Sequence, residues 1–163
     1  MYRIGQGWDR HPLEAGRRCV LGGVEFQDSP VGPVGHSDGD AVCHSITDAI
    51  LGAAGLGDIG RHFPDTDSRW AGANSLELLR EAVRLVRGRG FRVANVDCTV
   101  ITEQPVIAPR SAAMQDALAG ALQTAPDRVS VKATRGEGLG PEGRGECVTV
   151  QAVALLMADQ GDG

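Results

Sequence analysis

Three residues in the N-terminal part of the chain carry side chains suited to a divalent metal. Asp9 and His11 are two positions apart, and in an extended segment this spacing projects both side chains from one face. His44 lies on the polar stripe of a predicted helix, and we expect Asp48, one turn later, to orient its imidazole. One aspartate and two histidines leave a tetrahedral metal one open position, as at a catalytic zinc. A solvated helix face with one surface histidine fits the spacing as well.

A polar turn at residues 36–40 leads directly into the helix that carries His44. Backbone amides at the start of a helix favour an anion, and His36 and Ser37 add hydrogen-bond donors for a phosphate. An entry turn in which Ser37 or Asp38 caps the helix explains the same residues. The turn is therefore a candidate phosphate site with a structural alternative.

The segment 57–67 combines glycine and proline with several carboxylates. The glycines and the proline favour a rigid loop, and Asp58, Asp65 and Asp67 could accept hydrogen bonds from sugar hydroxyls. Ordinary turn chemistry accounts for the same residues.

Charged residues also gather in the late glycine-rich part of the chain. Lys132, Arg135 and Arg144 can bind phosphates, and Glu137 offers hard oxygen ligands for a magnesium ion that bridges them. Surface charge without a ligand is the alternative. Residue types and spacing together indicate a metal-assisted phosphate site, without identifying a substrate.

Helices and strands have to position these residues. Apolar residues at helical spacing predict helices over residues 38–54, 75–87 and 109–122. β-Branched residues predict a strand over residues 91–101, and further strands are expected over residues 3–6, 18–21, 24–26, 129–134 and 147–157. We predict a single α+β domain over residues 1–163, a two-layer sandwich of helices on a mixed four-stranded sheet plus a small N-terminal hairpin.

The composition limits the classes of function. The 163 residues suit one domain, and 21 acidic against 16 basic side chains give a net charge of −5. Nucleic-acid binding needs clustered cations, so we predict no nucleic-acid partner. The N-terminus lacks an apolar leader and the longest apolar run is far below the ~18 residues of a membrane span, which predicts a soluble, cytoplasmic protein without a membrane partner. The four cysteines form no C-x-x-C pair, so we expect buried thiols.

Three motifs resemble one known enzyme family. They are GWDRH at residues 7–11, the long run at residues 36–60 that starts with HSDGD, and FPDTD at residues 63–67. They resemble the 2-C-methyl-D-erythritol 2,4-cyclodiphosphate synthase family, and the similarity covers essentially the whole chain. The resemblance implies cyclisation of 4-diphosphocytidyl-2-C-methyl-D-erythritol 2-phosphate with release of CMP, in non-mevalonate isoprenoid biosynthesis. It also implies a homotrimer with active sites between neighbouring subunits.

The resemblance also implies roles for individual residues. Asp9, His11 and His44 would hold zinc, and Glu137 would hold magnesium or manganese against the diphosphate. His36 would be catalytic, together with Arg135, which stands where the family usually has a threonine. The residues expected to contact the cytidine diphosphate substrate, some through backbone atoms and some from the next subunit, are Asp9, Arg10, His11, His36, Ser37, Asp58, Ile59, Gly60, Phe63, Pro64, Asp65, Thr66, Asp67, Thr102, Glu103, Gln104, Pro105, Val106, Ile107, Ala108, Thr134, Arg135 and Arg144.

Several positions depart from the usual family sequence. Gly136 replaces a threonine, Val106 replaces the lysine of the cytosine-pocket loop, and Pro141 replaces a phenylalanine. The changes at Arg135 and Gly136 leave open a catalytically impaired trimer that binds isoprenoid diphosphates, and a metal phosphohydrolase is a second alternative to the synthase. In the synthase, the substrate's own 2-phosphate would attack the β-phosphorus in line, so no covalent nucleophile is needed.

Overall fold

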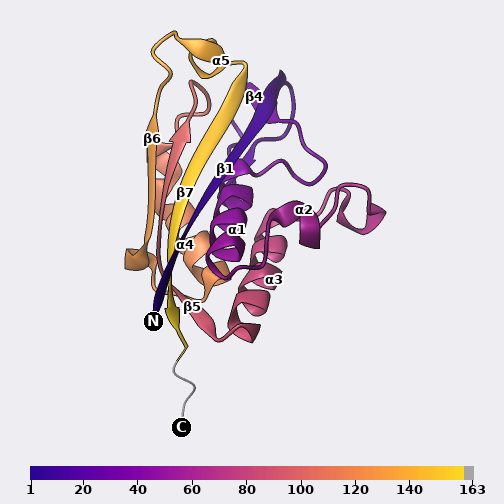
Figure 1. Ribbon diagram of the computed structural model, residues 1–163. Coiled ribbons are helices and arrows are strands. Elements are labelled where there is room, and N and C mark those ends of the chain that lie inside the picture. The colour runs from indigo at the N-terminus through magenta and orange to yellow at the C-terminus, as the bar shows by residue number, and fades with distance from the viewer. Residues whose placement is uncertain (160–163) are drawn as a thin grey trace.

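The computed structural model describes residues 1–159, in which one twisted sheet carries helices on one of its faces (Figure 1). Within these residues the sheet has five strands in the order β4-β1-β7-β5-β6. β5 and β6 run parallel, whereas the other neighbouring strands are antiparallel. The strands are β1 (Tyr2–Ala15), β4 (Val31–Pro33), β5 (Phe91–Ile101), β6 (Val129–Thr134) and β7 (Cys147–Ala158). A separate hairpin pairs β2 (Val20–Leu21) with β3 (Val24–Glu25).

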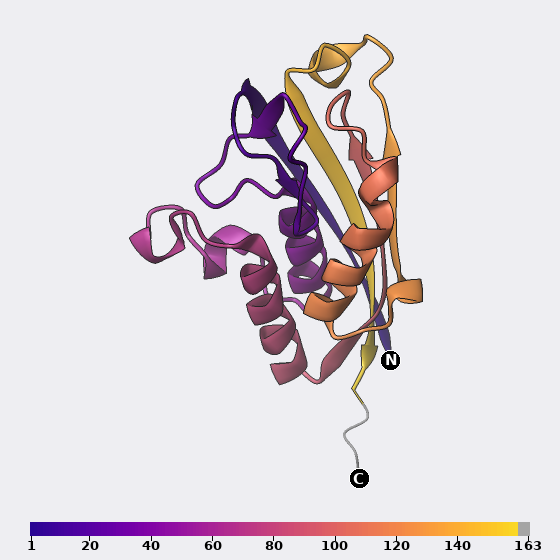
Figure 2. The ribbon, with the colours of Figure 1, turned by 180° about the vertical axis from the view of Figure 1, so that it is seen from behind.

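Three long helices form the second layer, which lies in front of the sheet in Figure 2. They are α1 (Ala41–Ala53), α3 (Ser75–Gly88) and α4 (Ser111–Leu122), and two one-turn helices, α2 (Ile59–His62) and α5 (Gly140–Gly143), lie in loops. α3 buries Leu79, Val83 and Val86 on one side, and β7 buries alternate residues from Val148 to Leu156. These two apolar faces form one core with α1 and α4. Among the helices of residues 1–159, none is long and apolar enough to cross a membrane.

The observed sheet corrects one part of the sequence-based prediction. The α+β class and the hairpin near residues 18–26 are confirmed. The prediction of a four-stranded sheet is wrong, because within residues 1–159 β4 pairs with β1 as a fifth strand. β1 itself is 14 residues long, much longer than the predicted 3–6. Its length is hidden in the sequence because its helix-facing side carries Gly5, Gly7, Asp9 and His11 where an amphipathic strand would show apolar residues.

Glycines in β1 allow α1 to lie directly on the strand. A Cβ atom at Gly7 would stand 1.8 Å from the carbonyl oxygen of Ser45, and one at Gly5 would stand 2.0 Å from that of Ala49. Any larger residue at either position would push the helix away. This close contact brings His44 of α1 beside Asp9 and His11, the next residues on the same face of β1.

The cap of α1 also differs from the prediction. Asp40 is fully buried, and its carboxylate accepts hydrogen bonds from two amides of the first helical turn and from the amides of Gly22 and Gly23 in the hairpin. The expectation that Ser37 or Asp38 caps this helix is therefore wrong. Because Asp40 serves as the cap, both of these side chains are available for contacts near His44.

Candidate active site

Asp9, His11 and His44 meet at the contact between β1 and α1, as the sequence predicts. Asp9 Oδ2 lies 2.9 Å from His11 Nε2 and 3.1 Å from His44 Nδ1. The two histidine nitrogens are 3.1 Å apart. Ligands on a tetrahedral zinc with bonds of about 2.0–2.1 Å are separated by about 3.3 Å, so the three atoms are arranged as zinc ligands would be.

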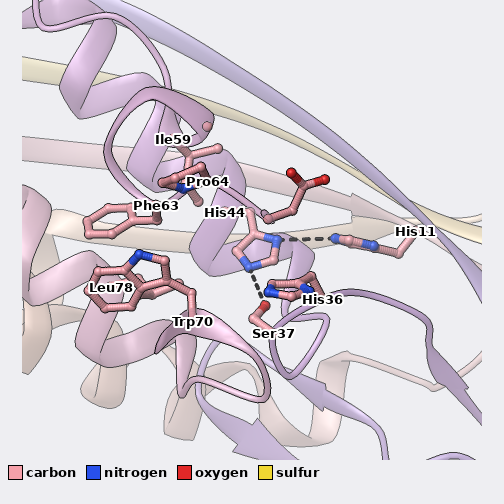
Figure 3. A pocket seen from close by; sticks show the side chains of 11 residues that line it. His11, His36, Ser37, His44, Ile59, Phe63, Pro64, Trp70 and Leu78 are labelled. Carbon is pink, nitrogen blue, oxygen red and sulfur yellow. Dashed lines mark hydrogen bonds between the residues drawn. The ribbon is translucent and has the colours of Figure 1, made fainter. Parts of the chain in front are cut away.

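The other ring nitrogens of the two histidines are held by hydrogen bonds. His11 Nδ1 lies 2.7 Å from the carbonyl oxygen of Val34, which can only accept, so this nitrogen carries a hydrogen and Nε2 faces the triad. His44 Nε2 lies 2.9 Å from Ser75 Oγ and 3.0 Å from Ser37 Oγ. Figure 3 shows His44 between His11 on one side and Ser37 on the other. Each ring therefore directs one nitrogen toward the metal position and anchors the second one in the protein.

The prediction that Asp48 orients His44 is wrong. The Asp48 carboxylate accepts a hydrogen bond of 2.7 Å from the backbone amide of Ile59. It therefore fixes the start of α2, a loop element of the cavity wall, and the imidazole is anchored by Ser75 and Ser37.

The charges of the triad support one another. Burial by itself would raise the pKa of Asp9, but the imidazoles of His11 and His44 beside it hold this pKa well below its usual range. Burial opposes protonation of His11, yet the hydrogen bond and charge of Asp9 and the Val34 carbonyl raise the pKa of this imidazole above its ordinary value. The carboxylate is thus ionised at neutral pH, and a proton on His11 competes with any metal for the same nitrogen.

A cavity of about 390 Å³ opens beside the triad (Figure 3). One side presents polar groups of His36, Ser37 and His44, and the other side is apolar, with the ring of Phe63 edge-on to that of Trp70. Its lining residues are His11, His36, Ser37, His44, Ile59, Gly60, Phe63, Pro64, Asp65, Trp70 and Leu78. The cavity therefore combines a metal-ligand triad with a phosphate-compatible turn and an apolar wall.

Most of the predicted substrate residues between positions 9 and 67 line this cavity. Asp58 is not among the lining residues, and its carboxylate caps α2 by accepting from the amide of Arg61, at 2.9 Å. Asp67 caps a 3-10 turn (Ser68–Trp70) and pairs with Arg69. Thr66 is exposed and does not line the cavity.

The predicted nucleotide residues form a second, separate group. A smaller cavity of about 130 Å³ lies where β5 and β6 end. Its lining residues are Thr102, Glu103, Pro105, Val106, Ile107, Ala108, Ala133, Thr134 and Arg135. Gln104 lines a neighbouring cavity, and the two groups of predicted residues share no lining residue in one chain.

The remaining predicted residues lie away from the triad. The Arg10 side chain extends from the opposite face of β1, donates to Thr149 Oγ1 at 2.9 Å and pairs with Glu142. Arg144 pairs with Glu146 at 2.7 Å. Glu137 lies in the loop between β6 and α5, has a φ of 53° and lines neither cavity. Within one chain, the structure therefore does not bring Glu137 or Arg144 to the triad.

Gly136, a departure from the family sequence, has a packing reason. A Cβ atom at this position would stand 2.3 Å from the backbone nitrogen of Gly143. The backbone amide of Gly136 also donates to Glu103, at 3.1 Å. The glycine thus allows the loop after β6 to fold closely against α5.

Three residues of the site were not predicted from the sequence. Trp70 and Leu78 supply the apolar wall, and Ser75 anchors His44. Only the position of Ser75 directly after the cap residue Asn74 stands out in the sequence, and that position indicates a helix start and no ligand contact.

An α+β fold that holds an ionised aspartate and two anchored histidines beside a cavity is typical of an enzyme with a catalytic metal site. Comparisons with known proteins specify the family. The model of the YgbB family matches residues 2–157. The chain therefore belongs to this family, that of the 2-C-methyl-D-erythritol 2,4-cyclodiphosphate synthases.

Individual relatives agree with this assignment. The chain is 58% identical to a 2-C-methyl-D-erythritol 2,4-cyclodiphosphate synthase of Laribacter hongkongensis, over 96% of each chain. It is 56% identical to the bifunctional enzyme IspD/IspF of Anaeromyxobacter sp., over 94% of this chain but only 39% of that enzyme. A solved structure of a 2-C-methyl-D-erythritol 2,4-cyclodiphosphate synthase in a CDP-bound form superposes with a TM-score of 0.87 at 43% identity, over 95% of this chain and 100% of that one. The chain thus spans nearly all of the single-function relatives and about two fifths of the bifunctional ones.

Proposed function

We propose that this chain converts 4-diphosphocytidyl-2-C-methyl-D-erythritol 2-phosphate to 2-C-methyl-D-erythritol 2,4-cyclodiphosphate with release of CMP. The observation that carries the proposal is the triad of Asp9, His11 and His44 beside the cavity, in a chain of this family. In the reaction an oxygen of the 2-phosphate forms a bond to the β-phosphorus. The bond from that phosphorus to the bridging oxygen breaks, and CMP leaves with this oxygen. No covalent bond to the protein is required.

The side chains of the triad fit a zinc ion. The inward-facing atoms are one carboxylate oxygen and two imidazole nitrogens, within 3.1 Å of one another. Bound zinc, with magnesium or manganese at Glu137, would polarise phosphoryl oxygens and offset their negative charge. In a chain with a net charge of −5 such compensation is needed for a strongly anionic substrate.

Protein groups around the triad would orient the substrate. His36 and Ser37, at the polar turn before α1, line the cavity and would donate hydrogen bonds to a phosphate there. Phe63, Trp70 and Leu78 would exclude water from the reacting groups. Restricting attack to the 2-phosphate in this way favours cyclisation over hydrolysis.

The proposed enzyme is a homotrimer, and two features support an assembly with active sites shared between subunits. The face of the sheet opposite the helices exposes Ile4, Trp8 and Val153, which are 72%, 48% and 43% accessible. Exposed apolar residues on one face are typical of a surface covered by a partner. The cavity near residues 102–108 and the triad cavity are also separate in one chain, so a neighbouring subunit would have to supply the nucleotide pocket.

Phosphorus NMR of the reaction products tests the proposed function. The purified chain, incubated with the substrate, zinc and magnesium, should yield a cyclic diphosphate and CMP. Free phosphate or an acyclic monophosphate would instead identify a phosphohydrolase. Unchanged substrate would indicate a binding protein without cyclase activity.

A further inference from the structure

The anchor of His44 continues beyond the two serines that contact its ring. Ser75 Oγ lies 2.9 Å from His44 Nε2 and 2.5 Å from Asp38 Oδ1. The second oxygen of the same carboxylate accepts the backbone amide of Ser75 at 3.0 Å. Asp38 lies in the turn before α1, and Ser75 is the first residue of α3 and fully buried. A chain of hydrogen bonds therefore joins three elements at the back of the metal-ligand triad.

The direction of each hydrogen bond in this chain is determined by chemistry. An ionised carboxylate can only accept, so the single hydrogen of the Ser75 hydroxyl points to Asp38. The hydroxyl then has only lone pairs to offer His44, which must donate from Nε2. A neutral imidazole with its hydrogen on Nε2 has a lone pair on Nδ1. Nδ1 is the nitrogen that lies 3.1 Å from Asp9 Oδ2.

We propose that Asp38 and Ser75 are positioning residues that fix the ring orientation and tautomer of His44, so that Nδ1 is ready to bind the metal. This inference rests on the metal site of the proposed function and adds the residues that set its affinity. Outer hydrogen-bond partners of metal-binding histidines generally have this effect, and removing them weakens metal binding by about 10- to 100-fold.

Ser37 provides a matched comparison within the same site. Its hydroxyl lies 3.0 Å from His44 Nε2, nearly the distance of Ser75. No carboxylate accepts its hydrogen among the described contacts of residues 1–159, so it can either donate to the ring or accept from it. Ser37 therefore contacts His44 without specifying which nitrogen carries the hydrogen.

Asp38→Asn is an informative change because it alters the direction of the hydrogen bonds. Both carboxylate oxygens accept from Ser75, one from its hydroxyl and one from its amide. The oxygen that faces the hydroxyl also accepts the backbone amide of Asp40, at 3.2 Å, so either orientation of an asparagine would turn its NH₂ group toward an amide hydrogen. The orientation that keeps the oxygen toward the amide of Ser75 would turn the NH₂ group toward the hydroxyl. The hydroxyl would then donate to His44 Nε2 and favour a hydrogen on Nδ1, where the metal binds.

The experiment compares the full chain with the variants Ser75→Ala, Asp38→Asn and Ser37→Ala. Zinc affinity is measured by competition with a chromophoric chelator, and stability is measured by unfolding with all metal chelated. We expect zinc to bind about 10- to 100-fold more weakly to Ser75→Ala and Asp38→Asn. The loss of zinc affinity in Ser37→Ala should be clearly smaller. If Asp38→Asn fails to fold, the comparison of the two serine variants still decides.

Proton NMR of zinc-loaded protein with ¹⁵N-labelled histidine provides a readout that a merely structural role would not change. The His44 Nε2 hydrogen should be shifted downfield and exchange slowly with water in the unmodified chain and in Ser37→Ala. It should exchange rapidly in Ser75→Ala. Equal zinc affinities for Ser75→Ala and Ser37→Ala, or an unchanged Nε2 signal in Ser75→Ala, would overturn the inference. A chain that binds no zinc at all would overturn the metal assignment of the proposed function itself.

Discussion

Asp9 is the residue on which the metal site depends most directly. It supplies the only carboxylate among the three ligand atoms and is held ionised by its two histidine neighbours. Asp9→Asn should lower zinc affinity by about 100-fold or more and abolish cyclisation together with it. Calorimetric titration with zinc and a product assay check both effects. Asp48→Asn, a change of the same kind on a carboxylate outside the triad, should keep its zinc, and full turnover of metal-free Asp9→Asn would contradict the scheme.

His11 gives the site a predictable pH dependence. The pKa of His11 is raised in the folded protein. The protonated imidazole therefore adds to the free energy of unfolding of the metal-free protein. This contribution is fully present below about pH 6.5 and is lost as the pH rises through the raised pKa. Zinc binding should change in the opposite direction, because the metal displaces the proton from Nε2. The free energy of unfolding of the metal-free chain and of metal-free His11→Asn, measured across this pH range, tests the prediction. An equal slope in both proteins would exclude His11 as the source.

Among single residues, the sequence predicted the meeting of Asp9, His11 and His44 but not the hydrogen bonds that anchor His44. Asp9 and His11 follow from the two-residue period of a strand, and His44 follows from the polar stripe of a helix. The role given to Asp48 was wrong because helical spacing shows which residues share a face but not which acceptor the ring reaches. Ser75 lies 31 positions from His44, and only the packing of α3 beside α1 brings them together.

The contact between β1 and α1 is the element pair that builds the site. Gly7→Ala would place a methyl group within 1.8 Å of the Ser45 carbonyl oxygen, so α1 must shift. We expect a loss of about 1–3 kcal/mol in the free energy of unfolding, together with weaker zinc binding because His44 moves from Asp9. Gly52→Ala is the matched control, because this helical glycine has open space around it and alanine there should be neutral or stabilising. Equal stability of the two variants would contradict the close-contact argument.

The elements that could be predicted are those with a clear apolar period. Residues 91–101 and 129–134 were predicted as strands and form β5 and β6, and the amphipathic α3 was found to within one residue. β1 was mostly missed because glycines and metal ligands occupy its inner face. The one-turn helices α2 and α5 lie in glycine-rich loops, where four residues are too few to show a helical period.

For the whole molecule, the separation of the two cavities leads to a mixing experiment. Asp9→Asn damages the metal site, and Ala108→Trp would fill the cavity near residues 102–108, so each variant alone should be inactive. If active sites form between subunits, mixed trimers contain some sites with both halves intact. Dissociating and reassociating the two variants together should therefore restore part of the activity. Activity that stays absent in proven mixed trimers would show that each chain carries its own complete site.

The exposed apolar residues on the open face of the sheet allow a test of the proposed trimer. Trp8→Glu places a charge among exposed apolar residues, which should disrupt a trimer and its shared sites while leaving zinc binding intact, since Trp8 points away from the triad. Light scattering gives the mass, and zinc titration gives the control. An active variant with the mass of a monomer would contradict shared sites.

Assembly is the property that is hardest to predict from the sequence, because the exposure of Ile4 and Trp8 is seen only once β1 is placed in the sheet.

Anomalous diffraction at the zinc edge, from a crystal grown with CDP, tests the central claim most directly. We expect one strong peak per chain, about 2.0–2.2 Å from Asp9 Oδ2, His11 Nε2 and His44 Nδ1, with the diphosphate beside it in the cavity. A chain that is active under the same conditions but shows its metal elsewhere, or shows none at these three atoms, would contradict it.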